Sequence, residues 1–233
     1  MRLFRAGKGR DANIALLEAV KYGVPSAMFS LGFSYATGDG VRRDRQKSIA
    51  WYHRAAEFGH AQAMFNLGYL ALHGRGMPKD ERVALRWFKR ASVQGDADAA
   101  EYVGDAYRDG AGIRRDLRTA LGFHERAALG GSGEAALKLG YLVFHGIGGP
   151  ADRPAAARWY RIGARRGSTG AMFNLGLCYA RGDGVRKSRT LAISWIIKAA
   201  EQGHQASWEW LRAQSDDAAV RALRYLIDRK VKQ

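Results

Sequence analysis

The stretch that decides the fold is AMFSLGFSYATGDGVRRDRQKSIAWYHRAAEFG, residues 27–59. Four of its features return every 36 residues: a Leu-Gly pair, a Gly-x-Gly loop, a large aromatic residue and a final glycine. The pairs begin at positions 31, 67, 103, 139 and 175, with valine in place of leucine in the third copy. Four markers in one register over five copies identify a tandem repeat, and such a repeat decides the fold class.

Each repeat is predicted to contain two helices. In the first copy a helix is expected over about 26–37, and Gly38 ends it because glycine enters the left-handed conformation at little cost. The apolar stripe of this helix consists of Met28, Leu31, Gly32 and Tyr35. Asp44 is expected to cap a second helix over about 45–58. The residues expected to face the core from that helix are Trp51, Ala55 and Phe58.

The five copies extend over most of the chain. They cover about 24–59, 60–95, 96–131, 132–167 and 168–203, named here repeats 1 to 5. A cap helix is expected over 11–22 within the N-terminal segment 1–23, and a divergent helix over 205–214. Ser215 is then expected to cap a terminal helix that completes the segment 205–233. The sequence therefore predicts an all-α fold: a right-handed α/α superhelical solenoid of antiparallel helix pairs, forming one domain over 1–233.

The repeat resembles a known family. Read as A-x-x-x-L-G-x-x-Y-x-x-G-x-G-V-x-x-D-x-x-x-x-x-x-W-x-x-x-A-A-x-x-G, residues 27–59 are similar to the Sel1-like repeat, which is related to the tetratricopeptide repeat. Local departures include Val103, Phe123, Gly163 and Ser188. The resemblance implies a protein-binding scaffold or adaptor, often in bacterial signalling, secretion or envelope assembly, and it implies no catalytic residues.

The motifs considered for catalysis and metal binding are incomplete or missing in the sequence, which favours a protein that is not an enzyme. Some secreted relatives of the family are associated with penicillin binding, but Ser-x-x-Lys and Lys-Thr-Gly are absent from the sequence. Ser132 is expected to lie in a turn, and Cys178 in the core. His124 is interpreted as an ordinary helix-face residue, because Ala128 stands where a zinc helix needs its second histidine. We expect no cofactor and no metal, and a penicillin-interacting hydrolase is the weakest alternative.

A candidate groove follows from the repeat, because the first helices of such solenoids line the concave surface. The residues that form this candidate partner groove are Phe29, Phe33, Phe65, Asn66, Tyr69, His73, Glu101, Asp105, Asp109, Tyr141, His145, Phe173 and Asn174. In the functional interpretation, aromatic side chains bury an apolar peptide segment and the three carboxylates receive a Lys, an Arg or an amino terminus. In the alternative, the phenylalanines pack between helices, the carboxylates form a solvated face, and the asparagines are exposed helix residues.

A second candidate surface follows from the charge, which is +16 with 38 Lys and Arg residues against 22 Asp and Glu. Basic residues recur in the loops of alternate repeats and would lie along one edge. This basic edge consists of Arg42, Arg43, Arg45, Arg114, Arg115, Arg118, Arg186, Lys187 and Arg189. It predicts an acidic protein or polyanion as partner, or else is the ordinary charged exterior of a solenoid. Nucleic acid ranks well below protein because no recognised nucleic-acid motif accompanies the charge.

The ends and the overall hydropathy bear on location. The N-terminal segment lacks the apolar core that a secretory signal needs, and no run of about 18 apolar residues suggests a membrane span. We therefore expect a monomer in the cytoplasm, or in the periplasm if a leader has been removed.

Overall fold

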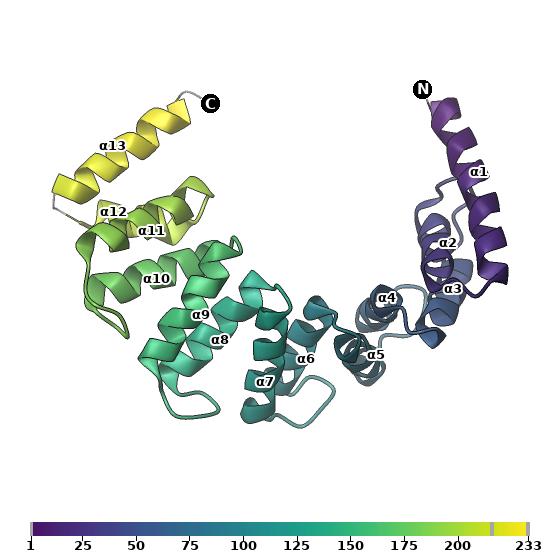
Figure 1. Ribbon diagram of the computed structural model, residues 1–233, viewed down its shortest axis with the longest axis horizontal. Helices are drawn as coiled ribbons and strands as arrows, with labels where there is room; N and C mark the ends of the chain where they lie inside the picture. Colours follow the sequence, from purple (N-terminus) through teal and green to yellow (C-terminus); the bar gives the residue numbers. More distant parts are fainter. Residues whose placement is uncertain (1, 215–216, 232–233) are drawn as a thin grey trace. The chain divides into compact units, whose positions relative to one another are not determined.

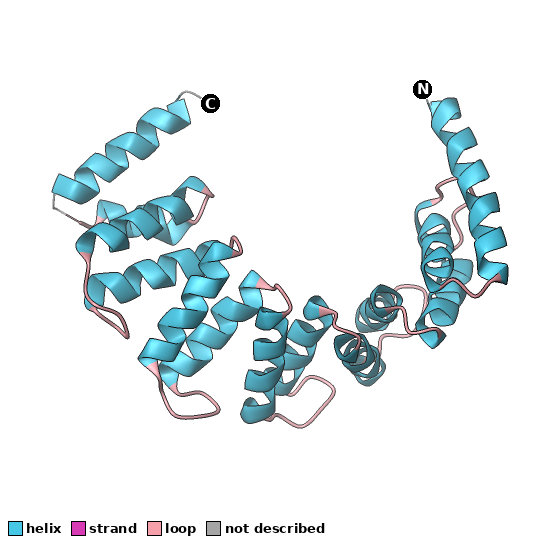
Figure 2. Ribbon diagram, in the orientation of Figure 1, coloured by secondary structure: helices cyan, strands magenta, loops and turns pink. Residues whose placement is uncertain are grey.

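The computed structural model describes residues 2–214 and 217–231, and within these ranges every regular element is an α-helix (Figures 1 and 2). The helices are α1 (Arg2–Lys21), α2 (Pro25–Thr37), α3 (Arg45–Glu57), α4 (Ala61–His73), α5 (Glu81–Val93), α6 (Ala97–Asp109), α7 (Leu117–Leu129), α8 (Gly133–His145), α9 (Arg153–Arg165), α10 (Thr169–Arg181), α11 (Arg189–Glu201), α12 (Gln205–Arg212) and α13 (Asp217–Val231). The all-α prediction is confirmed. Two compact units divide the chain: unit 1, Met1–Arg115, contains α1–α6, and unit 2, Asp116–Gln233, contains α7–α13. The single domain stays a prediction.

Each repeat supplies one A helix (α2, α4, α6, α8, α10) and one B helix (α3, α5, α7, α9, α11). The Asp44 amide donates to the Tyr35 carbonyl over 2.9 Å, and Gly32 lies against Ser48, so the chain runs back along itself and the pair is antiparallel. Gly38 ends α2 with a φ of 85°, as expected. The residues that cap the B helices through side-chain oxygens are Asp44, Asp80, Asp116, Asp152 and Ser188.

The Leu-Gly glycine lets the two helices of a repeat touch. A Cβ added to Gly32 would lie 2.6 Å from the Tyr52 ring, which is too close for any side chain. The same relation holds, at 2.5 to 2.8 Å, for Gly68 with Phe88, Gly140 with Tyr160 and Gly176 with Ile196. The B helix therefore turns Tyr52 to the core, where it is 4% exposed.

The expected core face of the B helix was therefore wrong in part. Ala55 is buried, but Phe58 is 56% exposed and Trp51 is only half-buried. The Trp51 ring instead lies under the Arg54 guanidinium at 5.0 Å, a cation–π contact on the outer side of the helix. The contact recurs between Arg90 and Trp87 at 4.6 Å, between Arg126 and Phe123 at 5.6 Å, and between Lys198 and Trp195 at 4.6 Å.

The second glycine of each Gly-x-Gly loop joins one repeat to the preceding one. A Cβ on Gly112 would meet the Glu81 backbone, at the start of the previous B helix, at 3.0 Å. In the same way, a Cβ on Gly148 would meet the Leu117 backbone and one on Gly184 the Arg153 backbone, each 31 positions earlier. A Cβ on Gly40 would meet the Gly9 backbone on α1, again 31 positions earlier. The N-terminal helix thus takes the place of a preceding B helix. It begins at Arg2, nine positions before the helix expected at residue 11.

The C-terminal helices cover the last repeat of unit 2. Leu211 of α12 is fully buried, and the Trp208 indole donates to the Ala200 carbonyl over 3.1 Å. Ala219 of α13 is also fully buried. The expected cap Ser215 lies outside the described residues. Along the described part of the chain, none of the helices combines the length and apolarity that a membrane crossing requires.

Candidate binding surfaces

The first row of the candidate groove packs consecutive repeats together. Phe29 stacks on His60 with ring centroids 4.6 Å apart, and Phe65 lies 5.8 Å from Tyr102. In unit 2 the Phe173 ring lies 5.0 Å from His204. Each phenylalanine is half-buried against the next helix pair, either on a helix or on the residue that caps it, so this row serves mainly as a contact between consecutive helix pairs.

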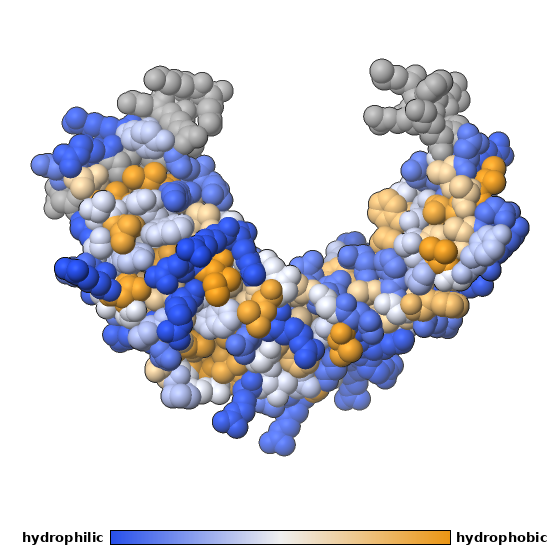
Figure 3. Space-filling view, viewed as in Figure 1, coloured by the Kyte–Doolittle hydropathy of each residue, from blue (hydrophilic) through white to orange (hydrophobic). Residues whose placement is uncertain are grey.

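The next row along the A helices is accessible to solvent, and we name it the outer row: Phe33 and Tyr69 in unit 1 and Tyr141 in unit 2. Phe33 is 53% exposed and Tyr141 is 50% exposed, whereas Tyr69 is half-buried. Tyr69 contacts His73 one turn later, at 4.3 Å between ring centroids, and Tyr141 contacts His145 at 4.4 Å. Figure 3 shows, on the visible face of each unit, exposed hydrophobic residues in small groups among hydrophilic ones. Each unit therefore presents aromatic rings that a partner can cover.

The acidic residues of α6 already have a cation beside them. Arg108 donates to both carboxylate oxygens of Asp109, at 2.8 and 2.7 Å, and pairs with Asp105 at 2.8 Å. The hydrogen bond to Asp109 raises the pKa of Arg108 above its ordinary value, with partial burial opposing it. Glu101 is half-buried on the same helix. A basic group of a partner would therefore have to compete with Arg108 for this stripe.

The two asparagines of the candidate groove are half-buried, and Asn66 has a partner within the protein. Its side chain hydrogen-bonds Tyr52 of the preceding repeat. Burial nevertheless raises the pKa of Tyr52, since desolvation outweighs that bond. Asn66 thus contributes to packing between repeats 1 and 2, and Asn174 occupies the equivalent position in unit 2.

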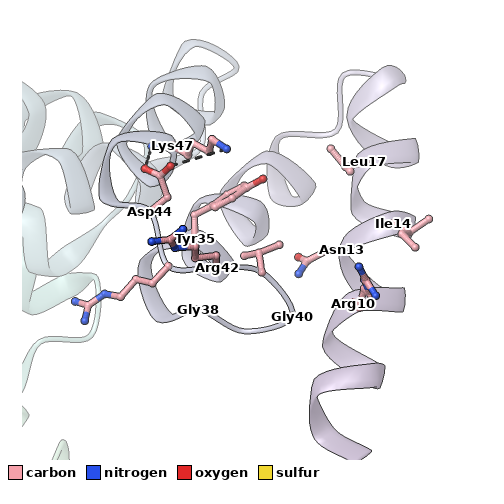
Figure 4. Close-up of a pocket in the computed structure, with 12 residues that line it drawn as sticks. Arg10, Asn13, Ile14, Leu17, Tyr35, Gly38, Gly40, Arg42, Asp44 and Lys47 are labelled. Carbon is pink, nitrogen blue, oxygen red and sulfur yellow. Dashed lines mark hydrogen bonds and ion pairs between the residues drawn. The ribbon is translucent and has the colours of Figure 1, made fainter. Parts of the chain in front are cut away.

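Two residues of the basic edge, Arg42 and Arg43, line a large cavity between α1 and the loop that joins α2 to α3 (Figure 4). We name it the repeat 1 cavity; its volume is about 1100 Å³. Asn13, which is 4% exposed, reaches from α1 toward the loop and donates to the Asp39 carbonyl over 2.8 Å. The lining residues are Arg10, Asn13, Ile14, Leu17, Tyr35, Gly38, Gly40, Val41, Arg42, Arg43, Asp44 and Lys47. The lining therefore contains four cations and one carboxylate.

A smaller cavity of about 580 Å³ lies in unit 2, and we name it the repeat 5 cavity. Its lining residues are Arg161, Tyr179, Val185, Arg186, Lys187, Ser188 and Leu191. The Arg161 guanidinium donates to the Tyr179 hydroxyl over 3.2 Å, which holds the guanidinium at the cavity wall. Among the described residues that line this cavity, three are cationic and none is acidic.

The remaining residues of the basic edge have mixed surroundings. Arg189 turns to α12, where it lies 4.9 Å from the Trp210 ring and donates to Gln214 over 3.1 Å. The stem of Arg45 lies against Gly76 of the next loop. The exposed members of this group are Arg45, Arg114 and Arg115 in unit 1 and Arg118 in unit 2. Arg42, Arg43, Arg186 and Lys187 are thus the members that line cavities.

The residues considered for chemistry have structural roles. The Ser132 hydroxyl caps α8 by accepting from the Ala135 amide over 3.0 Å. Burial raises the pKa of the Cys178 thiol to about 11, so the thiolate is scarce at neutral pH. His124 is fully buried, which corrects the expected helix-face position: it occupies in repeat 3 the place of Tyr52. Across the described residues, no cluster of three or more His, Cys, Asp or Glu side chains is suited to a metal ion.

Both cavities contain residues that the sequence analysis did not single out as binding residues. These residues are Arg10, Asn13, Tyr35, Arg161 and Tyr179. The sequence does contain a pattern that marks them. Tyrosine recurs at positions 35, 107 and 179, each time just before a loop that carries a basic cluster. In repeat 3 the Tyr107 hydroxyl accepts from Lys89 over 2.8 Å, as Tyr179 does from Arg161. This pattern recurs every two repeats, so it is not among the features that every repeat has in common.

Comparisons with known proteins agree with this architecture. The family model described as Sel1 repeat matches residues 25–60, 61–96, 97–132, 133–168 and 169–204. A solved Sel1 repeat protein from Oxalobacter formigenes is 29% identical, with a TM-score of 0.80 over 99% of this chain and 97% of that one. A protective antigen of uropathogenic Escherichia coli with an SLR fold is also 29% identical, with a TM-score of 0.81 over 95% of this chain. The chain spans 49% of that antigen's length. No curated protein matches the chain.

Proposed function

Because this chain belongs to the Sel1 repeat family, we propose that it is a non-catalytic scaffold that binds a protein or peptide partner through the outer row of its A helices. Sel1 repeats generally mediate protein–protein interaction and are generally non-catalytic. Both structural relatives named above come from bacteria, which supports a role in bacterial signalling, secretion or envelope assembly.

One observation carries the proposal: the same A-helix position presents an aromatic ring to solvent in both units. Phe33 in unit 1 and Tyr141 in unit 2 are each half exposed, although aromatic side chains gain most from burial. Aromatic anchors of this kind contribute a large part of the binding energy in many interfaces. The first row, which packs repeats together, supplies a rigid base, so binding costs little ordering of the scaffold.

The experiment compares two double variants in partner capture. Phe33→Ala with Tyr141→Ala removes the exposed rings of the outer row. We expect it to lower the affinity for the partner at least about tenfold, because each ring is a candidate hot spot. Phe58→Ala with Val93→Ala is the control, since both residues are exposed hydrophobics at the ends of B helices. Each variant is used to capture proteins from a lysate of the source organism, and the recovered partner is then titrated calorimetrically.

The outcome separates the outer row from other surfaces. Loss of the partner by the first variant only, with unchanged helical circular dichroism, supports the proposal. Equal retention by both folded variants contradicts it. Partner recovery that disappears at moderate salt in every protein contradicts it as well, because an interaction carried by the basic edge is screened by salt.

A further inference from the structure

We propose that the repeat 1 and repeat 5 cavities bind phosphorylated segments of a protein partner, with the phosphoryl group held by the paired loop cations. This surface differs from the outer row, so it is a second contact of the scaffold. Three features of the molecule point to this ligand: the cavity recurs, its lining is basic, and one amide oxygen beside it is buried without a donor.

The cavity recurs at equivalent sequence positions. Leu17, Tyr35, Val41, Arg42, Arg43, Asp44 and Lys47 in the repeat 1 cavity correspond, 144 residues later, to Arg161, Tyr179, Val185, Arg186, Lys187, Ser188 and Leu191 in the repeat 5 cavity. The tyrosine, the valine and the two loop cations are thus common to both. In repeats 2 and 4 the tyrosine position holds Ala71 or Val143, and the first cation position holds Pro78 or Pro150. The paired cations therefore belong to particular repeats and are not a general property of the loops.

The repeat 5 cavity is lined by groups that donate hydrogen bonds. Arg161 uses one N–H for the Tyr179 hydroxyl, and its guanidinium carries several more. Because that hydroxyl accepts from Arg161, its own proton can point toward an acceptor in the cavity. Arg186 and Lys187 are exposed at the rim. A ligand that suits this lining carries several acceptor oxygens and more than one negative charge.

A phosphate monoester has those properties. It carries a charge of about −1.5 to −2 at neutral pH and three strong acceptor oxygens, and arginine binds it through paired hydrogen bonds. A glutamate or aspartate side chain offers one negative charge and two oxygens. Three cations without a carboxylate in the repeat 5 cavity therefore favour the phosphorylated side chain.

The repeat 1 cavity indicates that the phosphoryl group belongs to a peptide. Asn13 is 4% exposed, and no described residue donates a hydrogen bond to its side-chain oxygen. A buried acceptor without a donor is costly, so Asn13, which lines the cavity, would gain by turning its oxygen toward a peptide N–H of the ligand. Ile14 and Leu17 are 58% and 49% exposed at the same cavity, where they can contact an apolar neighbour of the phosphorylated residue. A free phosphate ion would use neither feature.

The test uses defined probes and a residue-level readout. The probes are the capped peptide Ala-Leu-Ala-phosphoSer-Leu-Ala, its serine and glutamate counterparts, inorganic phosphate, and a short single-stranded DNA. Each is titrated into the 15N-labelled full chain while the side-chain signals of Asn13 and of the arginines are followed by NMR. We expect the phosphopeptide to shift the Asn13, Arg42 and Arg161 signals and to bind at least about tenfold tighter than the glutamate peptide.

Charge-matched variants locate the binding. Arg42→Gln with Arg43→Gln should lower the affinity of the repeat 1 cavity for the phosphopeptide about tenfold or more. Arg186→Gln with Lys187→Gln should lower the affinity of the repeat 5 cavity by a similar factor. The control is Arg75→Gln with Lys79→Gln, which removes the same charge from the repeat 2 loop. We expect that control to change either affinity less than about twofold, because neither residue lines a described cavity and salt screens exposed charges.

Several outcomes would overturn the inference. If the serine peptide binds as tightly as the phosphopeptide, the phosphoryl group is not recognised. If inorganic phosphate binds as tightly, the peptide is not recognised. Tighter binding of DNA at the same signals, lost equally in the repeat 2 control, shows a general polyanion surface instead. None of these results bears on the outer row, because the probes and variants of this test do not involve Phe33 or Tyr141. Failure of this proposal is therefore distinguishable from failure of the proposed function.

Discussion

At the scale of single residues, the fold depends on glycines that have a ring for a neighbour. Gly140 lies under Tyr160, whose ring is 3% exposed and cannot move aside without opening the core of unit 2. Gly122 of α7, in contrast, has no atom within 4 Å of an added Cβ apart from its chain neighbours and the nearby backbone of its own helix. Two helical glycines of the same unit therefore differ in whether the space beside them is occupied.

This difference gives opposite expected effects for one substitution. Gly140→Ala should lower the free energy of unfolding by about 1 to 3 kcal/mol, because the new methyl group overpacks the helix contact. Gly122→Ala should raise it by about 0.5 to 1 kcal/mol, because alanine loses less backbone entropy in a helix. Urea denaturation followed by circular dichroism measures both. A stabilising Gly140→Ala would show that the close approach to Tyr160 is unimportant.

At the scale of elements, the A helices begin with different capping groups at one equivalent position. His60, Asp96, Ser132 and Ser168 all accept a hydrogen bond from the amide three residues later. In α4 the acceptor is the unprotonated Nδ1 of His60, 3.3 Å from the Ala63 nitrogen. Protonation of that ring would turn the acceptor into a donor and lose the cap.

Acid should therefore weaken unit 1 through His60. Burial lowers the pKa of His60, and burial also lowers the pKa of His53. Below the ordinary histidine value of about 6.5 the unfolded chain then binds more protons than the folded one, so the free energy of unfolding falls as the pH drops. Urea midpoints at pH 7.5 and pH 5.5 measure the fall. His60→Ser keeps a cap without a titrating ring and should show a smaller one, and an equal fall would rule out His60 as a source.

Which face of each element is buried could be predicted only in part. The repeat length, the helix pairs, the B-helix caps and Gly38 all follow from local patterns that recur with one residue type. The core residue of the B helix was missed because it changes type from Tyr52 to Phe88, His124, Tyr160 and Ile196. Packing against a glycine requires bulk, and several side chains supply it. The more regular Trp51 series lies beside a cation at the outer side of its helix.

The candidate groove shows the same limit. Phe29 and Phe33 differ by one helical turn, and both were reasonable groove residues from the A-helix pattern. Their different exposure follows from contacts with the next repeat, because His60 covers Phe29. Arg108 likewise reaches Asp105 and Asp109 only through its own side-chain conformation. The Phe29 contact depends on how one helix is rotated against the next, and the Arg108 contacts depend on a side-chain rotamer. Periodicity determines neither.

At the scale of the whole molecule, stability is carried by contacts between neighbouring elements. Leu139 of α8 is 3% exposed, whereas Leu191 of α11 is 44% exposed, and both lie in unit 2. In a repeat protein each element contacts mainly its neighbours, so a defect is felt most strongly nearby. A charge at Leu139 should therefore have local consequences that a bulk signal would not resolve.

Hydrogen exchange can locate the defect. Leu139→Asp should lower the protection of amides in α8, α9 and α10 by roughly 3 kcal/mol or more, since it buries an unpaired charge in place of an apolar side chain. Protection in α2 and α3 should change much less. Leu191→Asp, at an exposed site, is the control. Uniform loss of protection along the chain would show a single cooperative unit instead.

The alternation of loops gives the chain a second period, 72 residues, on top of its 36-residue repeat. The Gly-x-Gly junctions are alike in every copy, so a gain or loss of one repeat leaves each helix with a suitable neighbour. Such a change would, however, place two loops with the tyrosine and cations, or two loops without them, in consecutive repeats. The alternation of the two loop types would then be broken. A gain or loss of two repeats preserves both patterns. Copy number is therefore tolerant in steps of one for folding, but only in steps of two for the alternation of the tyrosine–cation loops.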